Sequence, residues 1–321
     1  MRIVFMGTPE FAVPSLRALA GAGHDILAVV TQPDRPRRRR SSPAQPSPVK
    51  AEAVRRDLPV LQPESVKEPA FVGRVRDLAA DTIVVVAYGQ ILPPEVLAIP
   101  PRWCINLHAS ILPKYRGAAP IARAILAGEK VTGVTTMKMD RGLDTGDILL
   151  QKEAVVGLAE TAGELTARLA DLGADVLRET LDLHARGGLE PRRQDAGEAT
   201  QAPPLTRADG RIDWSAGAQE IVNRVRACNP WPLATTFLGR RAIRIVRAEM
   251  SFENLTADAS RAAAGHVIAA EGGRILVRCR GVSRLAILEI GFPDRRTMSA
   301  REAINGRLIR AGEIFTSDPT G

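Results

Sequence analysis

The sequence is poor in aromatic residues and in cysteine, and both shortages restrict its class. Phe, Trp and Tyr make up 4% of the 321 residues, so we expect a core of Val, Ile, Leu and Ala. The three cysteines are odd in number and widely spaced, which argues against a disulfide framework. The four histidines have no metal-ligand spacing with them. We therefore expect reduced thiols in a cytoplasmic protein, and no bound metal.

Long apolar runs and nucleotide-binding fingerprints are also missing. No run approaches the roughly twenty apolar residues that a membrane helix needs, so we expect no membrane partner. The opening "MRIVFMGTPEF" has a short apolar stretch that ends in a turn, which predicts a first strand and not a signal peptide. That turn contains neither G-x-G-x-x-G nor G-K-[ST], so we expect no nucleotide there.

Positive charge, by contrast, is in excess and unevenly placed. The formal net charge is +8, of which +2 falls in residues 1–190 and +6 in residues 191–321. A basic C-terminal part suits a polyanionic partner such as a nucleic acid. Four consecutive arginines also stand at 37–40, inside "PDRPRRRRSSPAQPSP". A loop of this length within a compact domain is usually functional or disordered.

Strands and helices alternate through the first half of the chain, which predicts an α/β fold with a doubly wound, mostly parallel sheet. The run "TIVVVAYG" at 82–89 has no polar alternation, as is typical of a strand buried on both faces. The expected strands are 2–6, 26–31, a short one near Val60, 82–89, 104–108, 133–139 and 146–156, and the expected helices are 9–20, 48–56, 66–79, 118–127 and 162–185.

The pattern changes after the last of these helices. Residues 186–210 are polar and rich in Gly, Pro and charge, as in a linker. A helix at about 215–227 and five short strands then predict a smaller, OB-like (oligonucleotide-binding) β-barrel. We expect a catalytic domain over 1–188, a linker over 189–208 and the OB-like domain over 209–321.

Three polar side chains follow expected strands, at the sheet edge where open α/β folds bind ligands. Asn106 and His108 are two residues apart and so share one face of a strand, and Asp144 lies in a glycine-flanked loop. Together they could stabilise an oxyanion and move a proton, with the nucleophile supplied by the substrate. On spacing alone, a structural histidine and a plain turn at Asp144 are open alternatives.

Two stretches around these residues resemble the formyltransferases that use 10-formyltetrahydrofolate: "NLHASILPKYRGAAPI" and "TGVTTMKMDRGLDTGDIL". That family has an Asn, a His two residues later, a Ser-Leu-Leu-Pro-like turn and an Asp in a later L-D-T-G-D loop. The resemblance runs from Met1 to about Arg310. Six more stretches are similar to the members that act on methionyl initiator tRNA: "FMGTPEFAVPSL", "TQPDRP", "SPVK", "VVVAYGQILP", "RIDW" and "NPWP".

The resemblance implies a reaction and a role for each matching residue. A monomeric enzyme would transfer the formyl group of 10-formyltetrahydrofolate to the α-amino group of methionine on initiator tRNA, with Asn106, His108 and Asp144 as catalytic residues. The residues implied to contact folate are Tyr88, Gly89, Gln90 and Ile91 in one segment and Ser110, Ile111, Leu112 and Pro113 in the turn.

The resemblance also implies that the arginine loop reaches the acceptor end of the tRNA. The family loop commonly reads Ala-Gly-Arg-Gly-Lys-Lys, so this chain keeps the positive charge but not the glycines. Arginine suits this task because it forks onto phosphate or stacks on an unpaired base. The arginines expected to contact tRNA are Arg37, Arg38, Arg39 and Arg40 in the loop and, by clustering alone, Arg224, Arg226 and Arg241 in the C-terminal part.

Two other activities could use the same site, namely hydrolysis of 10-formyltetrahydrofolate and formylation of an amino sugar. A more remote alternative is a non-enzymatic RNA-binding protein, which would leave the three polar residues unexplained. The tRNA-related stretches and the basic C-terminal part favour formylation of tRNA.

Overall fold

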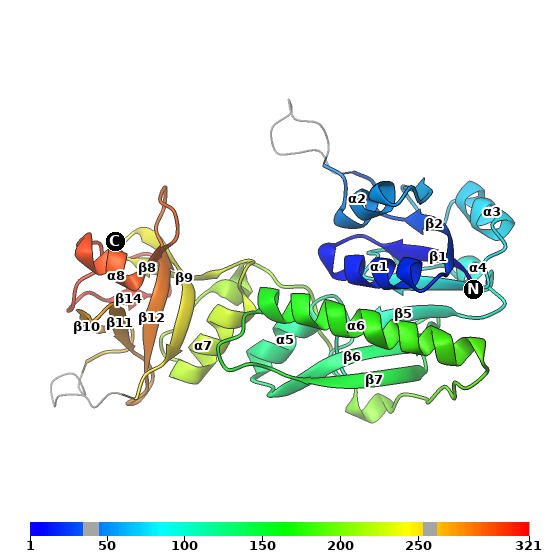
Figure 1. Ribbon diagram of the computed structural model, residues 1–321. Coiled ribbons are helices and arrows are strands. Elements are labelled where there is room, and N and C mark those ends of the chain that lie inside the picture. Colours follow the sequence, from blue (N-terminus) through cyan, green and yellow to red (C-terminus); the bar gives the residue numbers. More distant parts are fainter. Residues whose placement is uncertain (35–44, 253–261, 321) are drawn as a thin grey trace. The chain divides into compact units, whose positions relative to one another are not determined.

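The computed structural model describes residues 1–34, 45–252 and 262–320 of the chain (Figure 1). The predicted arginine run at 37–40 lies outside the described residues. The chain divides into two compact units. The first comprises residues 1–120, 131–155 and 166–202, and the second comprises 121–130, 156–165 and 203–321.

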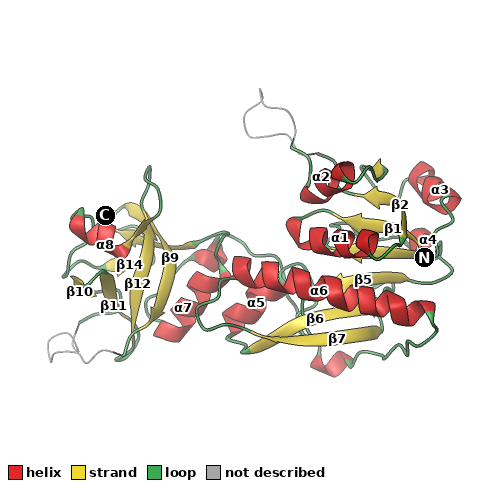
Figure 2. Cartoon of the chain, viewed as in Figure 1, coloured by secondary structure: helices red, strands yellow, loops and turns green. Residues whose placement is uncertain are grey.

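A seven-stranded sheet forms the centre of the first unit (Figure 2). Its strand order is β3-β2-β1-β4-β5-β6-β7. The strands from β3 to β5 are parallel, whereas β6 and β7 run antiparallel to their neighbours. The predicted doubly wound, mostly parallel sheet is confirmed. The strands are β1 (Arg2–Gly7), β2 (Asp25–Val30), β3 (Val60–Leu61), β4 (Thr82–Val86), β5 (Cys104–His108), β6 (Val131–Lys138) and β7 (Ile148–Val155).

Helices pack against both faces of this sheet. On one face, Val4 and Ile83 pack with Phe71 of α3. On the other, Leu107 of β5 meets α6 so closely that a Cβ on Gly173 would lie 2.7 Å from its methyl carbon. Between these helices, the central strands β4 and β5 are buried along their whole length. The helices of the first unit are α1 (Val13–Gly21), α2 (Pro48–Arg55), α3 (Pro69–Asp77), α4 (Pro94–Leu97) and most of α6 (Ala162–Ala185), whereas α5 (Pro120–Ala127) belongs, apart from Pro120, to the second unit.

Several element boundaries differ from the sequence prediction. The helix expected over 9–20 begins at Val13, after a 3-10 turn at Glu10–Ala12, and β6 and β7 differ from their expected ranges by one or two residues. Two further differences have clear local reasons. The strand expected over 82–89 ends at Val86, because Ala87 (φ +48°) leaves the extended conformation. The helix expected over 66–79 begins only at Pro69, which lacks an N–H and therefore suits a first helical turn. The short helix α4 was not expected.

The second unit is built on an antiparallel sheet of order β10-β11-β12-β9-β8-β14. Near its two edges, the N–H of Val267 donates to the carbonyl of Glu313 and that of Phe315 to Gly265, both at 2.8 Å. Phe315 also pairs with Leu238 of β8. These bonds join the edges into a small barrel, as the predicted OB-like domain requires. Its elements are α7 (Ala218–Ala227), β8 (Ala234–Leu238), β9 (Arg241–Met250), β10 (Val267–Glu271), β11 (Arg274–Arg278), β12 (Arg284–Gly291), β13 (Met298–Ser299), α8 (Ala300–Asn305) and β14 (Phe315–Thr316).

One helix supplies much of the core of this barrel. The apolar face of α7, with Ile221, Val222 and Val225, packs in one cluster with Ile243 and Ile245 of β9. None of the helices in the described ranges combines the length and the apolar character that crossing a membrane requires.

The segment expected as a linker, 189–208, is divided between the two units. Arg192 forms a β-bridge with Ile148, and the first unit continues to Ala202. From residue 203 the chain belongs to the second unit. Backbone pairs therefore hold much of this segment, and the expected domain boundaries stay a prediction.

Candidate active site

Asn106 and His108 lie at the carboxyl end of β5, on one face of the sheet. β5 pairs in parallel register with β4, so that Asn106 stands beside Val85. Leu107, between them, faces α6 on the opposite side. Both polar side chains are buried, with exposed fractions of 9% for Asn106 and 6% for His108. The strand therefore fixes them side by side in a place largely closed to water.

The two ring nitrogens of His108 face different groups. Nε2 donates to the backbone carbonyl of Tyr115 at 3.0 Å, since a carbonyl oxygen can only accept. Nδ1 lies 3.7 Å from Oδ2 of Asp144, close enough for an ion pair but longer than a hydrogen bond. The imidazole is thus held between the segment after β5 and the loop after β6.

The Asp144 carboxylate is fixed by the backbone. Its Oδ2 accepts a hydrogen bond from the N–H of Gly117 at 2.8 Å. Gly117 has φ +124°, and a Cβ there would lie 2.7 Å from the carbonyl oxygen of Ala202, so the position requires glycine. Asp144 itself has φ +54°, a left-handed conformation uncommon outside glycine. Such strained backbone clusters at functional sites.

Asn106 offers the site a free amide group. Among the described residues, its side chain has no hydrogen-bond partner. An amide donor beside an imidazole and a carboxylate can stabilise an oxyanion while a proton is moved. The structure brings together all three residues singled out from the sequence, and their catalytic role stays a prediction.

The turn after β5, from Ser110 to Pro113, is held by the sheet beneath it. Thr135 Oγ1 donates to the carbonyl of Ser110 at 2.7 Å and accepts from the N–H of Leu112 at 3.2 Å. Ser110 and Leu112 are 0% and 2% exposed, whereas Ile111 and Pro113 are half-buried. Of the four residues expected to contact folate here, only Ile111 and Pro113 present side chains that a ligand can reach.

The second segment expected at folate, Tyr88 to Ile91, follows β4. Tyr88 is buried in the core, and that burial raises the pKa of its hydroxyl to about 12. The Gln90 amide accepts from the N–H of Val66 at 3.0 Å and so serves the fold. Gly89 is exposed, and Ile91 is 69% exposed. A ligand could contact the backbone around Gly89 and the side chain of Ile91.

The roots of the expected arginine loop are anchored, although Arg37 to Arg40 are not described. Lys50 of α2 donates from Nζ to Oδ2 of Asp34 at 2.5 Å and to Oε1 of Gln62 at 2.7 Å. The Gln62 amide donates in turn to Oδ1 of Asp34 at 2.8 Å. The hydrogen bond from Lys50 holds the pKa of Asp34 below its usual value. The chain before the loop is thereby fastened to the helix after it.

The three C-terminal arginines expected at tRNA occupy different surroundings. Arg226 is 7% exposed, and its guanidinium donates to the carbonyl of Gly157 at 2.6 Å. Arg224 donates to a carbonyl of the loop before α7 at 2.8 Å. Only Arg241 is exposed. The sequence held a signal for Arg226, which follows the apolar Val222 by four residues and so falls on the buried face of α7.

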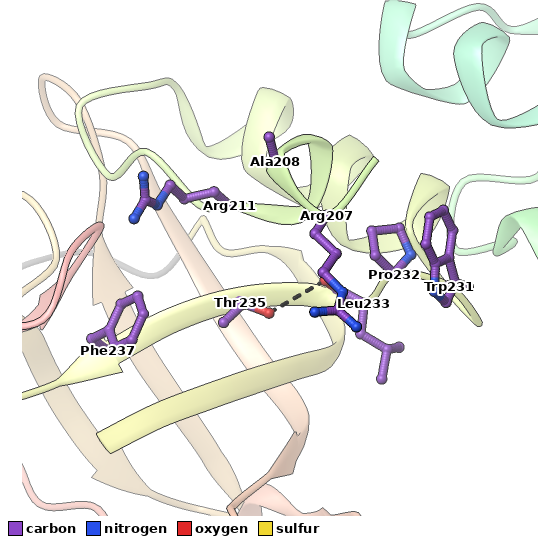
Figure 3. A pocket seen from close by; sticks show the side chains of 8 residues that line it. All are labelled: Arg207, Ala208, Arg211, Trp231, Pro232, Leu233, Thr235 and Phe237. Carbon is purple, nitrogen blue, oxygen red and sulfur yellow. Dashed lines mark hydrogen bonds between the residues drawn. The ribbon is translucent and has the colours of Figure 1, made fainter. Parts of the chain in front are cut away.

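Sequence reasoning missed an exposed groove on the second unit. Arg207 and Arg211 give it basic side chains, and Trp231, 55% exposed, gives it an aromatic surface. Arg211 also forms an ion pair with Asp318, which a phosphate would have to replace. Basic side chains beside exposed rings are typical of surfaces that bind nucleic acid. No local pattern predicts the groove, because it is assembled from separate segments. Its lining residues are Arg207, Ala208, Arg211, Trp231, Pro232, Leu233, Thr235 and Phe237 (Figure 3).

In the part of the chain that the structure describes, no group of three or more His, Cys, Asp or Glu side chains could hold a metal ion. Cys104, Cys228 and Cys279 are buried and unpaired with one another. Burial raises the pKa of the Cys104 thiol to about 12, which makes it unreactive.

Two family models match the chain, formyl transferase over residues 1–181 and formyl transferase, C-terminal domain, over residues 204–308. The methionyl-tRNA formyltransferase of Acetivibrio thermocellus is 46% identical over 316 residues, covering 98% of this chain and 99% of that protein. The methionyl-tRNA formyltransferase of Caldanaerobacter subterraneus subsp. tengcongensis is 48% identical over 316 residues, covering 98% and 100%.

Solved structures show the same fold at lower identity. The N-formyltransferase of Helicobacter canadensis, in complex with folinic acid and dTDP-3-aminofucose, superposes with a TM-score of 0.65. It is 16% identical and covers 89% of this chain and 98% of its own. At that identity the likeness concerns the architecture alone.

Proposed function

Because this chain belongs to the formyltransferase family, we propose that it transfers the formyl group of 10-formyltetrahydrofolate to the α-amino group of methionyl initiator tRNA. The observation that carries this proposal is the full-length match, since relatives of that name align with 98% of the chain and both domain models are present. The product is N-formylmethionyl-tRNA for translation initiation.

Asn106 and His108 at the end of β5, with Asp144 in the loop after β6, suit this reaction. When bound, folate supplies the formyl carbon, and its leaving nitrogen accepts the proton that the amine gives up. Asn106 donates its uncommitted amide N–H to the formyl oxygen, where negative charge develops. His108, buried beside it, moves the proton released by the attacking amine. Asp144, 3.7 Å from Nδ1, holds and polarises the imidazole.

The two expected folate segments offer apolar side chains that could contact a flat ring system. Ile91 is 69% exposed, and Ile111 and Pro113 are half-buried. We assign these three side chains to apolar contact with the pterin, and the exposed backbone around Gly89 to its hydrogen-bonding edge. Tyr88, Gln90, Ser110 and Leu112 would act by shaping that backbone, because their side chains are used inside the protein.

Two basic features of the chain suit a tRNA substrate. The arginine loop, with Arg37 to Arg40, is proposed to contact the acceptor end. The groove with Arg207, Arg211 and Trp231 is proposed as a second tRNA contact, with phosphates on the guanidinium groups and a base on the indole (Figure 3). Of the three C-terminal arginines, Arg241 is the strongest candidate because it is exposed, although its guanidinium also donates to the carbonyl of Leu308 at 3.3 Å. Arg224 is half-buried and Arg226 is 7% exposed, so tRNA could reach them only after their bonds to backbone carbonyls are broken.

We further propose that the enzyme acts as a monomer in the cytoplasm, needs no metal and has no membrane partner.

A single assay tests the proposed activity. Incubation with 10-formyltetrahydrofolate and methionyl initiator tRNA should give formylmethionyl-tRNA, and His108→Ala should abolish the product while tRNA affinity stays within about twofold. Equal folate turnover without tRNA would instead support the hydrolase. Formylation of an amino sugar in preference to tRNA would support the sugar-modifying alternative.

A further inference from the structure

The conformation of the Asp144 loop needs support from outside the loop. Asp144 has φ +54°, which an L residue adopts at a cost unless its surroundings impose it. Gly146, two residues on, packs directly on the end of β6, where a Cβ would meet the carbonyl of Lys138 at 1.8 Å. A loop this tightly placed depends on whatever satisfies its backbone carbonyls.

Gln194 satisfies two of these carbonyls at once. Its Nε2 donates to the carbonyl of Asp144 at 2.9 Å and to that of Gly146 at 2.7 Å. Both hydrogens of the amide are therefore used on the loop that carries the catalytic carboxylate. Gln194 is 7% exposed, so water does not compete for these bonds.

Arg116 sets the orientation of the Gln194 amide. Its Nε and Nη2 donate to Oε1 of Gln194 at 3.0 and 2.7 Å. A guanidinium can only donate, so the amide must turn its oxygen to Arg116 and its NH₂ to the loop. Arg116 is 8% exposed and has no carboxylate partner among the described residues. Burying a guanidinium without a carboxylate partner costs desolvation free energy that one neutral amide does not offset. This cost argues that the contact does more than stabilise the fold.

The residues on either side of Arg116 touch the other catalytic groups. The carbonyl of Tyr115 accepts from His108, and the N–H of Gly117 donates to the Asp144 carboxylate. One three-residue segment therefore contacts both His108 and Asp144 through its backbone. Its central side chain reaches, through Gln194, the carbonyls of the loop that carries Asp144.

We infer that Arg116 and Gln194 are positioning residues, which hold the Asp144 carboxylate against His108 and thereby set the rate of formyl transfer without touching the substrate. The inference rests on the proposed function for its rate readout. A displacement of about 1 Å of a catalytic group can cost roughly 100-fold in rate. We call the hydrogen bonds from Arg116 to Gln194 and from Gln194 to the Asp144 loop the Arg116–Gln194 brace. Weakening this brace should lower kcat and leave the KM for tRNA and for folate nearly unchanged.

Gln194→Glu is the most informative variant. The carboxylate keeps the volume of the side chain and strengthens the contact with Arg116, but it has no hydrogen to donate to the carbonyls of Asp144 and Gly146. We expect kcat to fall about 10- to 100-fold, with each KM within about twofold, by the positioning argument above. Gln194→Ala should lose a similar amount. The matched control is Glu198→Ala, an exposed residue on the same segment, which should behave as wild type.

A second pair of variants tests Arg116. Arg116→Met removes the donors that orient Gln194 and should lower kcat to the same extent as Gln194→Glu. Arg116→Lys keeps one charged donor and should restore part of the lost rate, because a lysine can reach one oxygen but not fork onto it. The inference would be wrong if Gln194→Glu were as active as wild type and if kcat in the other variants fell only in proportion to their melting temperatures. Arg116 and Gln194 would then contribute to packing alone.

Amide hydrogen exchange gives a readout that does not depend on the formyl acceptor. The N–H of Gly117 is bonded to the Asp144 carboxylate, so loss of the brace should speed its exchange about tenfold or more in Gln194→Glu. Faster exchange together with a normal kcat would overturn the inference, as would a lowered kcat with unchanged exchange. Absence of formyl transfer to tRNA in the wild type would instead overturn the proposed function. The exchange rate of the Gly117 N–H would then still show whether Arg116 and Gln194 hold the Asp144 loop in place.

Discussion

Single side chains in the candidate site differ in how far they are committed. His108 is held between Tyr115 and Asp144, whereas Asn106 keeps its amide free of partners among the described residues. An uncommitted donor can be aimed at developing charge without first breaking a bond, which is the condition for efficient oxyanion stabilisation.

Asn106→Ala should therefore lower kcat by about two to three orders of magnitude, the usual cost of one oxyanion donor. The folate and tRNA affinities should change much less than kcat, since Asn106 contacts only the formyl oxygen, where negative charge develops in the transition state. Single-turnover rates with saturating substrates measure this effect. A loss of less than about threefold would remove Asn106 from the mechanism.

The buried carboxylate of Glu52 contributes to the stability of the protein and has no part in the proposed activity. Its carboxylate is 3% exposed and is bound by Arg17 at 3.0 Å and by Arg55 and Arg56 at 2.6 Å. These hydrogen bonds, chiefly the one from Arg17, lower its pKa from 4.5 to about 2. A depressed folded-state pKa gives stability that is present above the unfolded pKa and lost as the pH falls through the folded one.

Glu52→Gln should accordingly cost about 3 kcal/mol of unfolding free energy at pH 7, from the size of the pKa shift. The difference between wild type and variant should shrink as the pH falls from about 4.5 towards 2. Denaturant unfolding at several pH values measures it. A difference that stays constant across this range would show that the arginines do not stabilise the charged form.

The residues of the site were predictable to different degrees. Asn106 and His108 share a strand face and end a buried strand, so their meeting could be expected from local pattern. Gln194 could not, because it lies in a polar stretch without periodicity and gains its role only from contacts with residues some 50 and 80 positions away. An amide in such a stretch carries no chemical signature of its own.

Whole elements respond to changes according to how closely they pack. A glycine inside a helix is normally improved by alanine, by about 1 kcal/mol. At Gly173 of α6 the added Cβ would lie 2.7 Å from the side chain of Leu107, on the strand that carries Asn106 and His108. Gly73 of α3 has no atom within 4 Å of the same position.

We expect opposite signs from these two glycines. Gly73→Ala should stabilise the protein by about 0.5–1 kcal/mol, whereas Gly173→Ala should destabilise it by about 1 kcal/mol, since overpacking of 1–3 kcal/mol exceeds the helix gain. Thermal or denaturant unfolding of the two variants gives the comparison. Equal stabilisation of both would mean that α6 can move away from β5 without cost.

The arginine loop is a further element with a specific expectation. Arg38→Ala with Arg39→Ala should impair formylation of tRNA, through its KM or kcat, and leave folate affinity unchanged. Arg74→Ala with Arg76→Ala, on the exposed side of α3, removes the same charge elsewhere and serves as the control. Equal rates for the two double variants would reduce the arginine run to a solvated stretch of charge.

Elements with a strong pattern of their own were found from the sequence, and those without one were missed. The alternation of buried strands and amphipathic helices predicted the first unit almost in full. The helices α4 and α8 and the strands β13 and β14 were not predicted, because each is only two to six residues long. Such short elements form because they pair or pack with other elements, as β14 pairs with β8. They are too short to show a hydrophobic periodicity in the sequence.

The net positive charge of the whole molecule should affect its affinity for tRNA. A net charge of +8, concentrated in the C-terminal part, should make tRNA affinity depend on salt. Two neutralised phosphates would already reduce affinity by about tenfold between 50 and 200 mM salt. Arg207→Ala with Arg211→Ala should flatten this dependence, by about 2 in the slope of log K against log salt.

Binding titrations at four or five salt concentrations measure that slope. The double variant should retain its rate of folate-dependent chemistry at saturating tRNA, because the groove is not part of the catalytic trio. A slope that is unchanged in the double variant would exclude the groove of Figure 3 as a phosphate contact.

The closure of the small barrel has a consequence for the order in which the chain becomes structured. Its edges are joined by bonds from Val267 and Gly265 to Glu313 and Phe315, nearly fifty residues later. During synthesis, the barrel cannot close until Phe315 has left the ribosome. The parallel sheet needs nothing beyond Ala202 for its own contacts and can form while the barrel is still incomplete. The unit that carries Asn106, His108 and Asp144 can therefore fold before the unit whose groove is proposed as the second tRNA contact.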